Sequence, residues 1–66
     1  MRTVILTQST QDKLSQDYWS FSDFIDKVTR DFKHNRHVQA EYYYPGGGLI
    51  VTQTNEGMVA EWIPEE

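Results

Sequence analysis

The stretch from Phe21 to Phe32 reads FSDFIDKVTRDF, and it decides the fold. Its apolar side chains recur at spacings of three and four residues; they are Phe21, Phe24, Ile25, Val28 and Phe32. This spacing gathers them into one stripe on a helix, while the charged residues between them fall on the opposite side. The stretch therefore predicts an amphipathic helix that packs its aromatic stripe against another layer.

The flanking residues predict where this helix begins and ends. Ser20 is placed to act as the N-cap, and Trp19 and Phe24 then have the spacing of a hydrophobic staple. Asn35 is a residue type that tolerates the left-handed conformation at the end of a helix. We predict a helix over Phe21–His34.

Strands are predicted on both sides of the helix. Short runs of β-branched and aromatic residues separated by Gly, Pro and Asn indicate them; they are Thr3–Thr7, Val38–Tyr44, Leu49–Thr54 and Met58–Ile63. Ser9 and Asp12 have capping-box spacing, which predicts a short helical turn after the first strand. The predicted fold is one α+β domain over residues 1–66, in the order β-α-β-β-β, with one amphipathic helix packed on one face of a small, mostly antiparallel sheet.

The turns between the last three strands predict a register. A four-residue loop at 45–48 would pair Tyr44 with Leu49, and a three-residue loop at 55–57 would pair Thr54 with Met58. Side chains alternate between the two faces of a sheet. The face toward the helix is then predicted to hold Val38, Ala40, Tyr42, Tyr44, Leu49, Val51, Val59 and Ile63.

The same register places Tyr43, Ile50 and Trp62 in one row on the face that the helix leaves uncovered. Exposed apolar patches mark interaction sites, and Trp and Tyr are frequent hot-spot residues. We predict that this row binds a partner. The alternatives are cross-strand packing that strengthens the sheet and, less directly, a small-ligand site.

A basic cluster surrounds the end of the predicted helix. Lys27, Arg30, His34 and Arg36 are the members predicted to bind an anion, such as a phosphate or an acidic partner. The alternative is that these residues only offset the helix dipole and pair with acids one turn away.

Metal, cofactor and catalytic sites are not predicted. The chain has no cysteine, and His34 and His37 straddle the helix end instead of sharing one helical face. The glycines at 46–48 do not open a helix and lack the Lys-Ser/Thr of a phosphate loop. No serine lies in a motif that would activate it as a nucleophile.

Composition narrows the class of function. The formal net charge is −4 and the sequence pI is about 4.9, which disfavours general binding to nucleic acid. No apolar run suits a membrane span, and residues 1–7 do not resemble a signal peptide, so we expect a cytoplasmic protein. The sequence predicts a non-enzymatic protein-binding module of the regulator, inhibitor or antitoxin type, acting on a partner or as a homodimer. The alternative is a single-stranded nucleic-acid binder that stacks bases on Tyr43 and Trp62 and meets phosphates at the basic cluster.

Overall fold

The computed structural model describes residues 4–65 and contains two helices and four strands. In chain order they are β1 (Val4–Leu6), α1 (Gln8–Gln16), α2 (Tyr18–Asn35), β2 (Gln39–Tyr44), β3 (Gly47–Thr54) and β4 (Gly57–Pro64). The predicted α+β class is confirmed. The predicted order with a single helix is wrong, because α1 precedes the amphipathic helix. Thr3, predicted to begin the first strand, lies outside the described residues.

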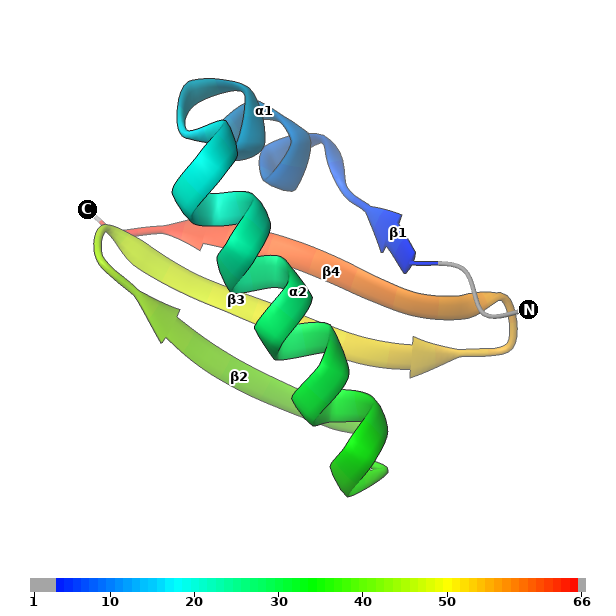
Figure 1. The fold of residues 1–66 in the computed structure, drawn as a ribbon. Coiled ribbons are helices and arrows are strands. Elements are labelled where there is room, and N and C mark those ends of the chain that lie inside the picture. The colour runs from blue at the N-terminus through cyan, green and yellow to red at the C-terminus, as the bar shows by residue number, and fades with distance from the viewer. Residues whose placement is uncertain (1–3, 66) are drawn as a thin grey trace.

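The four strands form one sheet in the order β1-β4-β3-β2. β1 runs parallel to β4, and the other neighbours are antiparallel. Both helices lie on the same face of this sheet, and α2 crosses the strands diagonally (Figure 1). The described part of the chain therefore has two layers, and the face of the sheet away from the helices has no element packed on it.

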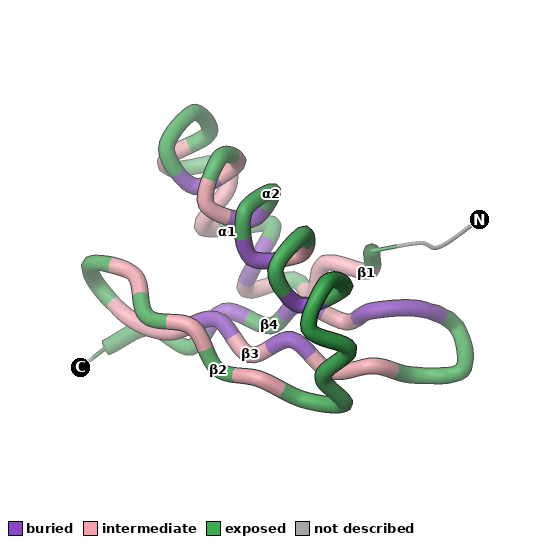
Figure 2. Tube along the Cα trace, turned by 60° about the horizontal axis from the view of Figure 1, so that its bottom comes forward, coloured by how far each residue is buried: buried purple, intermediate pink, exposed green. Residues whose placement is uncertain are grey.

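The core lies between α2 and the two central strands. Its buried apolar residues are Phe21, Ile25, Val28 and Phe32 from α2, and Leu49, Val51, Met58, Ala60 and Trp62 from the sheet. In Figure 2 the buried segments follow the side of α2 that faces the sheet and continue along β3 and β4. The predicted helical stripe is confirmed, except that Phe24 is only partly buried.

Helix α2 begins three residues earlier than predicted. Asp17 occupies the N-cap position, so Ser20 is inside the helix and does not cap it. Trp19 is 83% exposed and therefore does not form the predicted staple with Phe24. At the other end, Arg36 adopts the left-handed conformation (φ 56°) that the sequence assigned to Asn35.

Thr10 explains why a full helix, α1, forms where the sequence predicts only a turn. Its side chain is completely buried. The Thr10 hydroxyl donates to the Ala60 carbonyl at 2.7 Å and accepts from the Trp62 N–H at 3.0 Å. The β1–β4 ladder ends at the pair of Leu6 and Ala60. Beyond the end of this ladder the hydroxyl gives the buried Trp62 N–H its partner, and it shares the Ala60 carbonyl with the Thr7 N–H.

The first hairpin turns on two residues, Pro45 and Gly46, instead of the predicted four. Tyr44 pairs with Gly47. Proline fixes φ near −65°, and Gly46 has φ 102°, which together suit a type II turn. Pairing with β3 is displaced by two residues from the prediction. A displacement of two leaves every side chain on its predicted face, so Tyr42 still faces the helices.

The second hairpin also turns on two residues, 55–56, where three were predicted. Thr54 therefore pairs with Gly57, not with Met58. A displacement of one residue turns a strand over. The side chains of β4 that face the helices are Met58, Ala60 and Trp62, while Val59 and Ile63 point away. The predicted faces of β4 are wrong, and so is the predicted burial of Val38, which is 76% exposed.

Glu61 gives the physical reason for the register of β4. The predicted register would turn Glu61 toward the core, and an unpaired carboxylate is costly to bury. In the structure Glu61 is exposed and Trp62 is only 6% exposed. The indole lies in edge-to-face contact with Phe21 and near Tyr44, at ring-centroid distances of 5.3 and 6.1 Å.

Gly47 makes room for the indole of Trp62. A Cβ atom at Gly47 would collide with the Ile63 carbonyl and lie 2.7 Å from the indole ring. At Gly48 a Cβ atom would make only ordinary contacts, the nearest at 3.5 Å. The two neighbouring glycines therefore have different roles, although both lie in β3.

Gly47→Ala should lower the free energy of unfolding by about 1–3 kcal/mol, because an added methyl group must displace the indole or the backbone of β4. The matched control is Gly48→Ala, which should be neutral or stabilise by a few tenths of a kcal/mol to about 1 kcal/mol. Urea unfolding of both variants measures the difference. Equal stabilities would show that Trp62 does not pack over Gly47.

Candidate interaction surfaces

The face of the sheet away from the two helices is covered by no other described element. We call it the open face. Its strand residues are Ile5, Gln39, Glu41, Tyr43, Gly48, Ile50, Thr52, Thr54, Gly57, Val59, Glu61 and Ile63. Tyr43 is 80% exposed and Ile63 is 43% exposed, and they lie on either side of Gly48 in one row. Ile5, Ile50 and Val59 are half-buried.

The predicted row of Tyr43, Ile50 and Trp62 does not exist. Trp62 is in the core and pairs with Leu49 on the helix side of the sheet. Ile50 pairs with Glu41 and Glu61, one row away from Tyr43. Two of the three predicted partner-binding residues, Tyr43 and Ile50, therefore share the open face, and Glu61 occupies the position opposite Ile50 that was predicted for Trp62.

The open face carries acidic and no basic side chains among the described strand residues. Glu41 and Glu61 lie on either side of Ile50. The Tyr43 hydroxyl donates to a Glu41 carboxylate oxygen at 3.0 Å. This hydrogen bond, together with the charge of Glu41, raises the pKa of Tyr43. The face thus combines an apolar strip with two carboxylates, one of which is oriented by a phenol.

The predicted anion-binding residues are divided between two hollows. Lys27, Arg30 and His34 line a shallow hollow of about 310 Å³ on the side of α2, together with Asp31. The Lys27 ammonium is already paired with Asp23 at 3.4 Å. Asp31 accepts a hydrogen bond from the Tyr42 hydroxyl at 2.9 Å, which ties this side of the helix to β2. The carboxylates reduce the attraction of this hollow for an anion.

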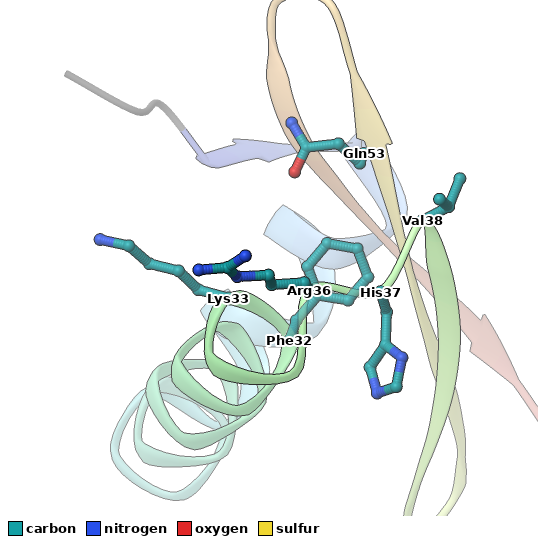
Figure 3. A pocket seen from close by; sticks show the side chains of 6 residues that line it. All are labelled: Phe32, Lys33, Arg36, His37, Val38 and Gln53. Carbon is teal, nitrogen blue, oxygen red and sulfur yellow. The ribbon is translucent and has the colours of Figure 1, made fainter.

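Arg36 lies apart from those three residues. It lines a larger hollow of about 650 Å³ where α2 passes into β2, with Phe32, Lys33, His37, Val38 and Gln53 (Figure 3). In this view the His37 ring points away from the Lys33 and Arg36 side chains, so the three do not converge on one point. Among the described residues no three His, Cys, Asp or Glu side chains are grouped as metal binding requires.

A second apolar surface, which the sequence analysis missed, lies beside β1. Tyr18 and Trp19 are 57% and 83% exposed, and their rings meet edge to face at 5.4 Å. Next to them, a groove of about 220 Å³ is lined by Val4, Leu6, Leu14, Ser22, Ile25, Asp26 and Thr29. The sequence analysis missed this surface because it predicted that Trp19 packs on Phe24 in a hydrophobic staple, and a staple residue would be covered.

The chain matches no protein-family model, and it shows no significant similarity to a curated protein or to a solved structure. Neither helix among residues 4–65 has the length and apolar character that crossing a bilayer requires. The functional argument therefore depends on the geometry of the surfaces described above.

Tyr42 supplies a pH-dependent part of the stability. Burial, and then the hydrogen bond to Asp31, raise the pKa of Tyr42 to about 12. An unfolded tyrosine ionises near pH 10. When the pKa of a group is higher in the folded state, its contribution to stability is complete at pH values below its pKa in the unfolded state. This contribution is lost as the pH rises to its pKa in the folded state.

We expect the free energy of unfolding to fall between about pH 10 and about pH 12, and to fall less in Tyr42→Phe than in the parent. Some decline should remain in the variant, since the pKa of Tyr43 and of Tyr44 is raised as well. Chemical unfolding at several alkaline pH values measures both slopes. Identical slopes would mean that the contact between Tyr42 and Asp31 does not form in solution.

Proposed function

We propose that this chain is a non-enzymatic protein-binding module that contacts its partner through the open face. The observation that carries the proposal is the exposure of Tyr43 and Ile63 on a sheet face that neither helix covers. A partner that covered this strip would also complete the burial of Ile50 and Val59, which are half-buried in the isolated chain. Removal of such apolar area from water drives most protein association.

The charges on the open face indicate the chemistry of the partner. Glu41 and Glu61 would lose solvent in the interface, and buried charges need partners. The expected partner surface therefore has an apolar centre with Lys or Arg on its rim. Charge complementarity of this kind contributes mainly to the rate and the specificity of association.

The open face favours a protein over single-stranded nucleic acid. Base stacking was assigned to Tyr43 and Trp62, but Trp62 is buried in the core and unavailable to a base. The carboxylates of Glu41 and Glu61 on the same face would repel phosphates. Tyr18 and Trp19 are exposed, but they lie at the start of α2, whereas the basic cluster lies towards its end.

Substitutions on the open face should weaken binding without unfolding the chain. In Ile63→Asp the dissociation constant for the captured partner should rise about 30-fold, the effect of losing a hot-spot contact of about 2 kcal/mol. Thermal stability should change little, because Ile63 is 43% exposed. The partner is first identified by affinity capture from the native cell and mass spectrometry, and its binding is then measured by calorimetry.

Two control variants make this experiment decisive. Val38→Asp introduces the same charge at an exposed apolar position outside the open face, and it should bind like the parent. Trp19→Ala changes the other apolar surface. If Trp19→Ala abolishes binding and Ile63→Asp leaves it intact, the groove beside β1 is the interface and the proposal for the open face is wrong.

A further inference from the structure

The two edges of the sheet differ in how many of their backbone groups are already hydrogen-bonded. At the β1 edge, the Thr7 N–H donates to the Ala60 carbonyl, and Thr10 satisfies the backbone of β4 further along. The Gln11 side chain donates to the Leu6 carbonyl at 2.8 Å. β1 is also only three residues long. This edge has few free backbone groups to offer to another strand.

The β2 edge has no such protection. The Gln53 N–H donates to the Val38 carbonyl, and hydrogen-bonded pairs alternate along an antiparallel ladder. The backbone N–H and C=O groups of Gln39, Glu41 and Tyr43 therefore point away from β3. β2 is six residues long, with the sequence QAEYYY, and it contains neither the Lys nor the Pro that often protects an edge strand. No described residue pairs with these outward groups.

We infer that two copies of this chain associate through their β2 strands, which pair antiparallel and join the two sheets into one. The proposed register has a twofold axis at Tyr42, so that Glu41 lies opposite Tyr43 of the second copy. Each such pair exchanges both of its backbone hydrogen bonds, since these residues have the outward groups. The inference does not rest on the proposed function, because its hydrogen bonds come from the backbone at the strand edge, and Glu41 and Tyr43 of the open face only set its register.

The side chains of β2 are self-complementary in this register. On the helix side, the small Ala40 lies opposite the large Tyr44 of the second copy, and the two Tyr42 rings meet at the axis. On the open face, Glu41 lies opposite Tyr43, whose hydroxyl already bonds Glu41 within one chain at 3.0 Å. A register centred on Glu41 would instead place two carboxylates directly opposite each other, which is unfavourable.

A carboxylate of α2 lies beside the proposed axis and would attract a base of the second copy. The hydrogen bond from Tyr42 holds the Asp31 carboxylate over this part of the edge. Arg30 is adjacent in the helix and lines the same hollow. Within residues 4–65 the only ion pair joins Lys27 and Asp23, so Arg30 has no acid of its own. Arg30 is therefore available to pair with an acid of the second copy, and Asp31, held beside Tyr42, is the candidate.

Sedimentation velocity of the full chain over a range of concentrations tests the inference. The parent should be a dimer at about 100 µM, and Glu41→Pro should raise the dissociation constant at least about tenfold. Proline removes an N–H that bonds nothing in the single chain, and edge strands tolerate it at such a position. The matched control Glu41→Gln keeps this N–H and should dimerise like the parent. Circular dichroism establishes that each variant is folded.

A charge-reversal pair tests the register and does not depend on proline. Tyr43→Glu places like charges opposite each other and should dissociate the dimer, whereas Tyr43→Glu combined with Glu41→Lys should restore it. Ile63→Asp should leave the dimer intact, because Ile63 is on the open face away from the β2 edge. A parent that remains monomeric up to about 1 mM overturns the inference. So does a dimer that Ile63→Asp dissociates and Glu41→Pro does not.

Discussion

The packing of Trp62 over Gly47 is the contact on which the rest of the structure depends. The indole occupies the space that a side chain at Gly47 would fill, and Phe21 and Tyr44 meet its other sides. The Lys13 ammonium lies 5.2 Å from its ring, so α1 contributes as well. Because side chains alternate in a strand, placing Trp62 inside determines the face of every other residue in β4.

The surface chemistry follows from that one orientation. With Trp62 inside, Glu61 and Ile63 point outward, and they join Glu41, Ile50 and Tyr43 on the open face. The β1 side of the sheet is closed by Thr10 and Gln11, while the β2 side keeps its backbone groups free. One face and one edge therefore remain available, and a partner and a second copy could occupy them at the same time.

The parts of the fold that depend on local patterns were predictable from the sequence. The apolar stripe of α2 follows from helical spacing. The predicted faces of β2 and β3 are also correct, although the predicted turn between these strands is two residues too long, because a register error of two residues leaves each side chain on the same face. The predicted faces of β4 are wrong, since a register error of one residue reverses the faces of a strand. The position of Glu61 was the signal that could have corrected this register.

Helix α1 and the coverage of the β4 edge depend on Thr10 contacting residues about 50 positions away, which no local pattern reveals. Of the candidate site, Tyr43 and Ile50 were placed correctly on the open face and Trp62 was not.

The most direct test of the central claim is acrylamide quenching of the fluorescence of Trp62. The chain has two tryptophans, 62 and 19, which are 6% and 83% exposed, so Trp19→Phe leaves the buried one and Trp62→Phe leaves the exposed one. In Trp19→Phe we expect emission at shorter wavelength and weak quenching, compared with strong quenching in a folded Trp62→Phe or in free tryptophan. If Trp62 in the folded Trp19→Phe chain is quenched as strongly as free tryptophan, the indole is outside the core, β4 has the opposite orientation, and the open face is not the surface described here.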